Sequence, residues 1–225
     1  MPDSIQIQDR LRQVIADGLT ASYTARSCKD DIETGNHYQS VQLGSEQTKG
    51  FRSGREPFLQ QVDFTGRSVL DLGSNLGEIS RAARARGARL VDGFEYDPFF
   101  LDLANTINAH NRETRVSFFL RDITDPTIYR EPYDIVLAFS VFSYVHSVVR
   151  EIAAITNAAL VIETHRLTNN LETDYLATLL PHFPHYAMLG ESDWGLNFDP
   201  GEKRAVIVFA KDPAALAAAL VSSQR

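Results

Sequence analysis

Short apolar runs recur along the chain from residue 68 onward, and segments of helical length separate them. The runs are rich in Val, Ile, Leu and Phe at both odd and even positions, which is typical of strands buried on both faces of a sheet. This pattern predicts strands at 68–72, 88–96, 115–122, 133–140 and 158–164. The intervening segments predict helices at 76–86, 98–110 and 145–156, with a short helical piece near 125–130. Strands that alternate with helices in this way indicate a parallel sheet.

The pattern changes after residue 164. A helix is expected over 169–181, followed by strands at 185–192 and 204–211. The turn-rich stretch 193–203 between these strands indicates an antiparallel hairpin. Asp212 and Pro213 then offer an N-cap and a first-turn proline for a final helix. The expected fold is therefore α/β and Rossmann-like, with five parallel strands, a C-terminal antiparallel hairpin and helices on both faces.

The region before residue 54 has a different character. Helical spacing of apolar residues predicts a helix at 4–17, whereas residues 20–53 are polar and punctuated by glycine. Such a long irregular segment suggests a lid or a substrate-facing flap, and 55–62 reads as a short helix. We therefore expect an N-terminal helix and lid segment over 1–53 and a core domain over 54–225.

Composition narrows the range of partners. The 225 residues carry a net charge of −7, which argues against a broad basic surface for nucleic acid. Four arginines between 81 and 89 are interpreted as a solvated helix face. The chain has a single cysteine, Cys28, no apolar run long enough to span a membrane and no Cys/His spacing typical of zinc. Together with an N-terminus unlike a signal peptide, these features predict a cytoplasmic protein without membrane association.

Residues 69–80, VLDLGSNLGEIS, join the first predicted parallel strand to the next helix through a glycine turn. Glycine lets a ligand approach the backbone, and the helix that follows presents free N–H groups. A Walker loop is excluded because no lysine follows Gly77, and the GxGxxG fingerprint is broken at Asn75 and Leu76. The broken fingerprint also speaks against a nicotinamide oxidoreductase.

Three further motifs follow in order. Glu95 lies at the end of the second predicted strand, Asp122 at the end of the third, and YDIVLAFSVFSYVH covers the fourth. With the pattern Asp71-x-Gly73-x-Asn75-x-Gly77, these motifs resemble those of class I S-adenosylmethionine-dependent methyltransferases. The resemblance covers about residues 54–211 and includes the closing hairpin. It implies S-adenosylmethionine as cofactor and S-adenosylhomocysteine as product.

The resemblance also implies roles for individual residues. Glu95 would grip the ribose hydroxyls, and Asp122 would take the adenine amine, with Ile123 and Tyr96 packing on the base. Asp71 would reach the ammonium of the methionine part. The full expected cofactor site is Asp71, Gly73, Ser74, Asn75, Gly77, Glu95, Tyr96, Asp122, Ile123, Phe139 and Ser140. Alternatively, Asp71 merely caps its turn, Glu95 pairs with an arginine and Tyr96 belongs to the core.

A methyl acceptor that must lose a proton benefits from a general base. His165 and His146 follow the fifth and fourth predicted strands, and histidine suits proton removal near neutral pH. Glu163 is a candidate to orient one of them, although a direct pair with His165 needs a bend after the strand. Either histidine could instead cap a helix. No metal site is predicted, although a weakly held magnesium ion remains open.

The acceptor is predicted from what surrounds the fourth strand. Amino-group methyltransferases of this family often carry Asn/Asp-Pro-Pro-aromatic there, whereas this chain has AFSVFSY. We therefore expect a small-molecule acceptor methylated at oxygen. The added segments supply arginine and aromatic residues suited to a small anionic or ring-containing molecule, namely Tyr38, Arg52, Arg55 and Trp194. Either arginine could equally clamp the cofactor's carboxylate.

Two other functions stay open at this point. One is RNA methylation, with Arg81, Arg84 and Arg86 contacting phosphates. The other is a module that binds S-adenosylmethionine without turnover. The sequence does not define an oligomeric state.

Overall fold

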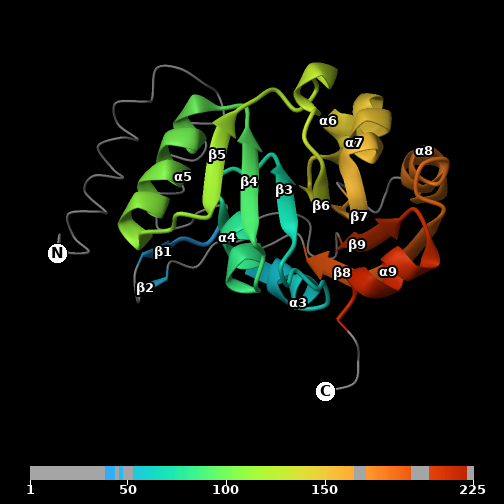
Figure 1. The fold of residues 1–225 in the computed structure, drawn as a ribbon, viewed down its shortest axis with the longest axis horizontal. Coiled ribbons are helices and arrows are strands. Elements are labelled where there is room, and N and C mark those ends of the chain that lie inside the picture. Colours follow the sequence, from blue (N-terminus) through green and yellow to red (C-terminus); the bar gives the residue numbers. More distant parts are fainter. Residues whose placement is uncertain (1–38, 44–45, 48–52, 165–170, 194–202, 222–225) are drawn as a thin grey trace.

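The computed structural model describes residues 39–43, 46–47, 53–164, 171–193 and 203–221. A seven-stranded sheet in the order β5-β4-β3-β6-β7-β9-β8 forms its centre (Figure 1). Strands β3 to β7 pair in parallel, and β9 is antiparallel to both β7 and β8. The strands span Ser68–Leu72 (β3), Leu90–Glu95 (β4), Val116–Leu120 (β5), Tyr133–Phe139 (β6), Thr156–Glu163 (β7), His185–Asp193 (β8) and Lys203–Ala210 (β9). The predicted Rossmann-like sheet with its antiparallel hairpin is confirmed.

The strand order creates a crevice next to β3. The chain moves outward from β3 to β4 and β5, and then returns to place β6 on the other side of β3. In open sheets of this kind, ligands bind beyond the carboxyl ends of the strands where the order reverses. Asp71, Glu95 and Ser140 all lie at or just beyond these ends.

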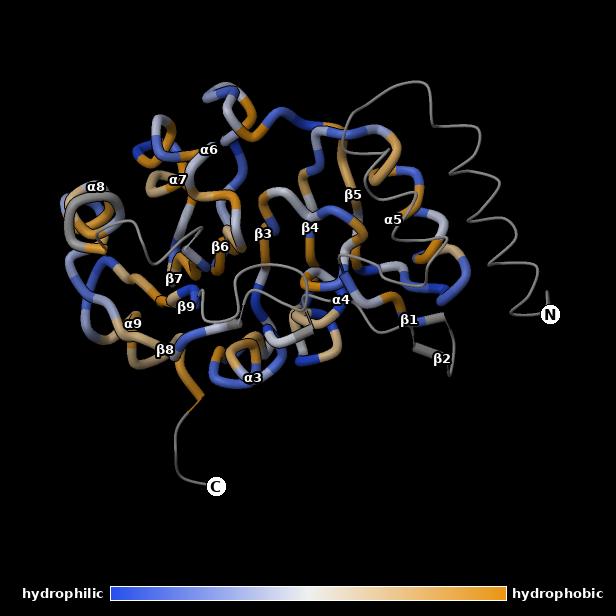
Figure 2. The backbone as a smooth tube through the Cα atoms, turned by 180° about the vertical axis from the view of Figure 1, so that it is seen from behind, coloured by the Kyte–Doolittle hydropathy of each residue, from blue (hydrophilic) through white to orange (hydrophobic). Residues whose placement is uncertain are grey.

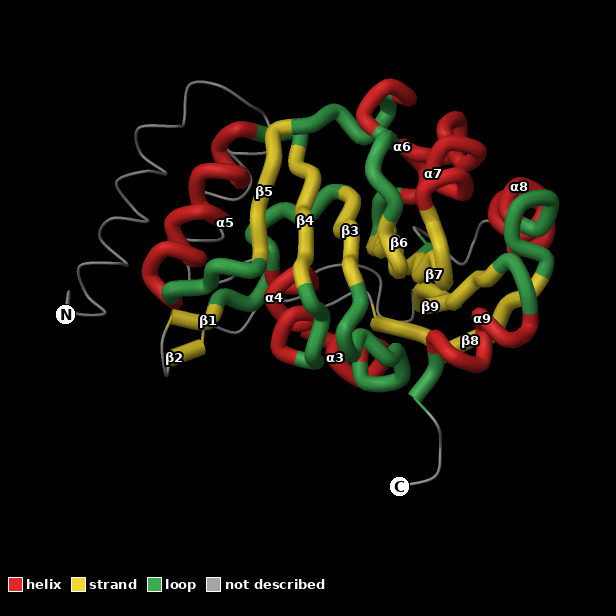
Figure 3. Tube along the Cα trace, viewed as in Figure 1, coloured by secondary structure: helices red, strands yellow, loops and turns green. Residues whose placement is uncertain are grey.

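Helices cover both faces of the sheet (Figure 3). The principal ones are α3 (Glu56–Leu59), α4 (Glu78–Ala85), α5 (Pro98–Asn111), α6 (Phe142–Val145), α7 (Val149–Ile155), α8 (Ala177–Leu179) and α9 (Pro213–Ala219). Single turns of 3-10 helix occur at Ser53–Arg55 (η1), Pro126–Ile128 (η2) and His146–Val148 (η3). Asp212 caps α9 by accepting a hydrogen bond from the Ala215 N–H at 2.8 Å, as expected.

Alternate residues of the central strands β3, β6, β7 and β9 enter two separate hydrophobic cores. In β6, Val136 and Ala138 pack with residues of α6 and α7, whereas Ile135 and Leu137 pack with residues of α3, α4 and α9. The strands consequently carry apolar residues at both parities, and β3 and β4 include orange, hydrophobic segments in Figure 2. This two-sided burial explains the apolar runs in the sequence.

Several predicted helices are shorter or more broken than expected. The helix predicted at 145–156 is divided into α6, η3 and α7. The one predicted at 169–181 begins, within the described residues, as a π-helical segment (η4, Leu171–Leu176) before α8. The one predicted at 55–62 is reduced to η1 and α3. Helix α4 starts at Glu78 rather than residue 76, because Gly77 has a left-handed φ of 78°.

Little of the region before residue 54 lies within the described residues. The short strands β1 (Gln42–Leu43) and β2 (Glu46–Gln47) pair antiparallel. Asn111 of α5 donates a hydrogen bond to the Gln42 carbonyl at 2.7 Å, which ties this segment to the core domain. The predicted helix at 4–17 and the predicted site residues Tyr38, Arg52, His165 and Trp194 lie outside the described residues.

Candidate functional site

The glycine turn after β3 has a left-handed residue at every second position. Gly73, Asn75 and Gly77 have φ angles of 68°, 51° and 78°. Asparagine tolerates this conformation better than most other residues, because its short polar side chain can bond locally. The spacing Gly-x-Asn-x-Gly is therefore explained by the backbone path of the turn.

Most main-chain N–H groups of this turn donate hydrogen bonds to other groups of the protein. Those of Gly73 and Ser74 both donate to the Phe94 carbonyl, at 2.9 and 3.0 Å. Ser74 is buried and does not line the cavity described below, so its predicted contact with the cofactor needs correction. Gly77 does not line the cavity either. A Cβ at this position would lie 2.2 Å from the Phe118 ring. Gly77 thus permits close packing of the helix on the sheet.

Glu95 is held in place at the end of β4 by two main-chain donors. One side-chain oxygen accepts from the Asn75 N–H at 2.7 Å and the other from the Asp97 N–H at 2.9 Å. Burial raises the pKa of Glu95, and these main-chain hydrogen bonds partly oppose that effect. A carboxylate has about four lone-pair sites, so capacity remains for two hydroxyl donors from a ligand.

Asp122, Ile123 and Thr124 form the next part of the same wall. Asp122 accepts from the Thr124 N–H and hydroxyl at 2.9 and 2.7 Å, which fixes its carboxylate in a local turn. Ile123 is buried, whereas Tyr96 is 70% exposed and still lines the cavity. A polar edge between two hydrophobic side chains suits a flat heteroaromatic ring with an amine.

Asp71 lies at the floor of the site beneath the glycine turn. Its side chain is buried and accepts a hydrogen bond from the Ser80 hydroxyl at 2.5 Å. Burial raises the pKa of Asp71 to about 7, against the opposing effects of Ser80 and Arg55. This carboxyl group is therefore poised to ionise when a cationic partner arrives.

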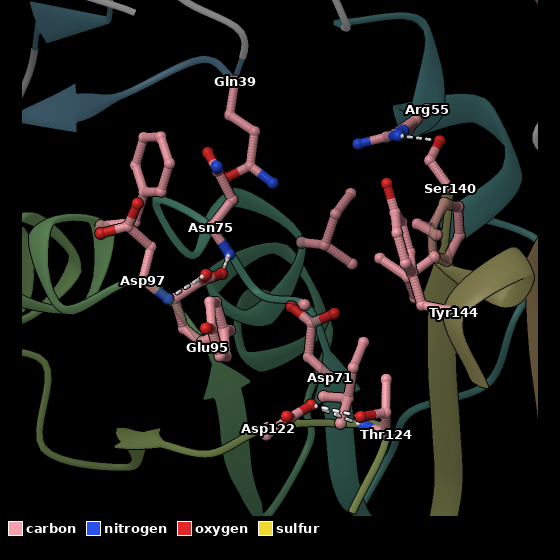
Figure 4. A pocket seen from close by; sticks show the side chains of 17 residues that line it. Gln39, Arg55, Asp71, Asn75, Glu95, Asp97, Asp122, Thr124, Ser140 and Tyr144 are labelled. Carbon is pink, nitrogen blue, oxygen red and sulfur yellow. Dashed lines mark hydrogen bonds between the residues drawn. The ribbon is translucent and has the colours of Figure 1, made fainter. Parts of the chain in front are cut away.

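These residues border a cavity of about 540 Å³ (Figure 4), within the range typical of ligand sites. One side of the cavity, which we call the carboxylate wall, is formed by Asn75, Glu95, Asp97, Asp122 and Thr124. The opposite side carries Arg55, Ser140 and Tyr144. Phe139 and Val141 also line the cavity. Predicted residues Asp71, Gly73, Asn75, Glu95, Tyr96, Asp122, Ile123, Phe139, Ser140 and Arg55 are therefore brought together around one cavity.

Behind that opposite side lies a buried cluster that we call the arginine network, formed by Arg55, Ser140, Glu163, Ser192 and Arg204. Arg55 forms an ion pair with Glu163 at 2.6 Å. The Ser140 hydroxyl accepts from Arg55 at 2.8 Å and from Arg204 at 2.6 Å, and donates to Glu163. Ser192 donates to the other Glu163 oxygen at 2.6 Å.

The network changes the interpretation of several predicted residues. Glu163, a candidate to orient a histidine, accepts hydrogen bonds from an arginine and two serines at its two oxygens, while His165 lies outside the described residues. Arg55, expected to bind the substrate or the cofactor's carboxylate, is buried with its guanidinium 5.6 Å from the centre of the Phe139 ring. Arg55 therefore makes a cation–π contact with the Phe139 ring.

His146, the second predicted base, is exposed on η3. Its Nδ1 lies 2.8 Å from the Ser143 carbonyl, and the residue does not line the cavity. This geometry favours the alternative interpretation, in which His146 caps a helix, over a role as general base.

Arg81 and Arg84 on α4 and Arg86 at its C-cap do not form the solvated face that the sequence suggested, whereas Arg89 is exposed. Arg81 donates to the Leu76 carbonyl at 2.6 Å, and burial lowers its pKa to about 10. Arg84 donates to the Ala88 carbonyl at 3.0 Å, and Arg86 pairs with Glu56. All three are half-buried. Because these guanidinium groups are engaged within the domain, they do not form a free basic surface.

Some cavity residues were missed by sequence reasoning. Asp97 caps α5 by accepting from the Phe99 N–H at 2.9 Å, and the Asp-Pro pair at 97–98 was a usable signal. Tyr144 falls within the quoted fourth motif. No feature of the sequence indicated that Gln39 lines the cavity or that Arg204 belongs to the arginine network behind it. Nothing in the local sequence of either residue predicts a long-range partner.

Two negative observations concern only the residues that the structure describes. Among them, no group of three His, Cys, Asp or Glu side chains is arranged to hold a metal ion. No helix in the described ranges has both the length and the apolar character needed to cross a membrane.

The strand order and the glycine turn define a Rossmann-like fold, with acids at the strand ends beside one cavity. Residues 69–160 match a family model described as a methyltransferase domain. This match supports the predicted methyltransferase class and enzyme type, with S-adenosylmethionine as the expected cofactor.

Solved structures agree on the fold. The bifunctional kinase-methyltransferase WbdD superposes with a TM-score of 0.53 and 20% identity, over 64% of this chain and 35% of that one. Magnesium protoporphyrin IX methyltransferase from Synechocystis PCC 6803, with bound S-adenosylmethionine, superposes with a TM-score of 0.52 and 16% identity. The match covers 66% of this chain and 72% of that one. A putative RNA methyltransferase from Pyrococcus horikoshii also superposes with a TM-score of 0.52 and 16% identity, over 66% of this chain and 76% of that one.

At these identities the structural likeness concerns the fold alone. This chain spans about a third of the length of the WbdD structure, 35%. No curated protein matches the chain.

Proposed function

We propose that this chain is an enzyme that transfers the methyl group of S-adenosylmethionine to an oxygen atom of a small molecule. The observation that carries the proposal is Glu95, held by two main-chain N–H groups at the edge of a cavity of about 540 Å³. A buried acid held in this way is suited to binding neighbouring ribose hydroxyls.

The remaining residues of the cavity fit the other parts of this cofactor. Asp122, Ile123 and Tyr96 offer an acceptor and hydrophobic surfaces for adenine. The buried Oδ1 of Asn75 has no hydrogen-bond partner among the described residues, so it is available to a ligand donor. Asp71 and Arg55 offer opposite charges to a zwitterionic amino-acid tail.

When bound, S-adenosylmethionine supplies an electrophilic methyl group on a positively charged sulfur. The role of the protein is to hold the acceptor beside that group, oriented and dry. Ser140, Val141 and Tyr144 border the cavity opposite the carboxylate wall, and we assign the acceptor to this side. We propose His165 as the base for an acceptor that must lose a proton, in preference to the exposed His146.

Two observations favour a small molecule over RNA. Arg81, Arg84 and Arg86 are engaged within the domain, and the chain has a net charge of −7. The sequence AFSVFSY at the end of β6 lacks the Asn/Asp-Pro-Pro-aromatic motif of amino-group methyltransferases, which favours oxygen as the acceptor atom.

Titration calorimetry with S-adenosylhomocysteine tests the cofactor assignment. Glu95→Ala should weaken binding by roughly 10–100-fold, because two charge-assisted hydrogen bonds are lost. Glu131→Ala, which removes an exposed acid away from the cavity, is the matched control and should leave affinity unchanged. No binding by the wild type at millimolar ligand, or equal affinity in Glu95→Ala, would refute the site.

Turnover assays test the acceptor class. The proposal expects methyl transfer to small hydroxyl-bearing acceptors that is unaffected by added bulk RNA. Competition by RNA that weakens steeply with salt would favour RNA methylation instead. Tight cofactor binding without transfer to any acceptor would favour a non-catalytic module. His165→Ala should lower turnover with little change in cofactor affinity, and unchanged turnover would remove it as the base.

A further inference from the structure

Gln39 reaches the cavity from outside the sheet-and-helix core. It precedes β1, is only 3% exposed, and lines the cavity together with Arg55 and Asn75. Figure 4 shows its side chain entering the site beside Asn75. A buried, uncharged amide on the wall of a ligand cavity calls for a physical reason, because a primary amide has two donor hydrogens and an acceptor to satisfy.

The orientation of this amide follows from its neighbour. The Glu78 N–H at the start of α4 donates to Gln39 Oε1 at 3.1 Å. A main-chain N–H cannot accept a hydrogen bond, so the oxygen must face the helix and the NH₂ group must face away from it. No described residue accepts a hydrogen bond from this NH₂ group, and the cavity lies on that side.

The segment that carries Gln39 is docked firmly on the core. Ser40 hydrogen-bonds the Glu78 carboxylate through both its main chain and its side chain, so the two segments cap each other. Val41 is 4% exposed, and the Gln42 carbonyl accepts a hydrogen bond from Asn111 at 2.7 Å. Gln39 is therefore held in place before any ligand binds, and a preorganised donor contributes more to affinity than a mobile one.

Donors and acceptors are segregated around the cavity. The carboxylate wall offers acceptors, which match the hydroxyls and the amine of a nucleoside. Gln39 and Arg55 offer donors, and Arg55 is close enough to Asp71 to influence its titration. The tail of S-adenosylmethionine carries both a carboxylate and an ammonium group, which fits donors beside a buried acid.

We propose that the Gln39 NH₂ group donates a hydrogen bond to the carboxylate of the cofactor's amino-acid tail. This inference rests on the proposed function, because it requires S-adenosylmethionine as the ligand. Gln39 then has two functions: its oxygen caps α4 and its nitrogen binds the tail. The segment before the core domain is in this way part of the cofactor site.

Calorimetry with two ligands isolates this contact. S-adenosylhomocysteine has the amino-acid tail, whereas 5′-methylthioadenosine has the same nucleoside and thioether but no tail. Gln39→Ala should weaken S-adenosylhomocysteine by about 10-fold and leave 5′-methylthioadenosine within about twofold. Gln60→Ala, at the exposed glutamine that is the C-cap of α3, is the matched control and should change neither affinity.

Gln39→Glu separates binding from capping. A glutamate oxygen can still accept from the Glu78 N–H, so the cap is kept, but the donor is replaced by a negative charge. We expect a loss of about 30-fold or more for S-adenosylhomocysteine, little change for 5′-methylthioadenosine, and a thermal midpoint close to that of the wild type.

The outcomes distinguish this inference from the function on which it rests. Equal weakening of both ligands in the variants would show that Gln39 acts through the fold or the nucleoside, and would overturn the proposal. Unchanged S-adenosylhomocysteine affinity in Gln39→Glu would overturn it too. If the wild type binds neither ligand, the proposed function itself fails and this inference fails with it.

Discussion

The two sides of the cavity are built in different ways. In the carboxylate wall, short-range turns hold the acids: Asp122 is bonded by a residue two positions away, and Glu95 by the main chain of the glycine turn and of Asp97. In the arginine network, side chains hold other side chains across long separations, as in Arg55 and Glu163, which lie 108 positions apart. The first side keeps hydrogen-bonding capacity for a ligand, whereas the second uses much of its capacity to join separate elements.

This difference teaches that charge at a site can serve binding or stability, depending on its partners. An acid held by backbone amides can be removed without leaving an unpaired opposite charge. Removing an acid that forms an ion pair with a buried arginine, as Glu163 does with Arg55, takes away a partner of that buried charge. Substitutions on the two sides should therefore separate ligand affinity from the free energy of unfolding.

The largest effect is expected for Glu163→Ala. Removing this carboxylate leaves Arg55 and Arg204 buried without it, which should lower the free energy of unfolding by about 3–5 kcal/mol. Urea denaturation measures the loss. Glu191→Ala, which breaks the exposed pair with Lys203, should cost less than about 1 kcal/mol. A Glu163→Ala protein as stable as Glu191→Ala would show that the network does not support the fold.

A smaller effect is expected from the titration of Asp71. Its folded-state pKa of about 7 lies above the ordinary value of 3.8, so its ionisation opposes folding. The contribution to stability is fully present below about pH 4 and is lost as the pH rises through 7. Between pH 6 and 8 this amounts to about 1.4 kcal/mol, or roughly 4 °C in the thermal midpoint without ligand.

Asp71→Asn provides the check on this assignment. The variant should lose less stability than the wild type between pH 6 and 8. Affinity for S-adenosylhomocysteine should rise over the same range in the wild type, because ionised Asp71 attracts the ammonium group, and should be flatter in the variant. Identical pH profiles for the two proteins would assign the titration to another group.

The smallest effect sharpens the comparison between the two sides. Tyr96 is 70% exposed, so Tyr96→Ala should leave stability unchanged and lower S-adenosylhomocysteine affinity about fivefold through lost packing on the base. Tyr144→Ala, on the opposite side, should leave that affinity within about twofold and raise the KM for the acceptor. The reverse pattern would exchange the cofactor and acceptor sides.

Sequence reasoning succeeded where a residue's role depends on its neighbours in the chain. The apolar runs predicted all seven strands of the main sheet, and the alternating Gly-Asn-Gly pattern predicted the turn, because left-handed φ angles restrict residue choice locally. Glu95 and Asp122 were found because strand ends are recognisable in sequence. Helix boundaries were less accurate, since tertiary packing breaks 142–155 into three short pieces.

The arginine network and Gln39 could not be predicted in this way. Arg204 falls in an apolar strand pattern, and only the pairing of β7 with β9 brings it near Ser140. The roles of Arg81 and Arg86 were mistaken for a similar reason, because helical spacing shows which face a residue occupies but not what covers that face.

The position of β9 has a consequence for how the domain assembles. Strand β9 follows β8 in sequence but lies between β7 and β8 in the sheet, so β8 joins the parallel strands only through β9. A folding intermediate that contains only the parallel strands would expose the edge of β7, and an unpaired edge promotes association with other chains. In such an intermediate the turn that holds Glu95 could already be formed, whereas Arg204 would still be missing. Nucleoside affinity should accordingly appear earlier in refolding than methyl transfer.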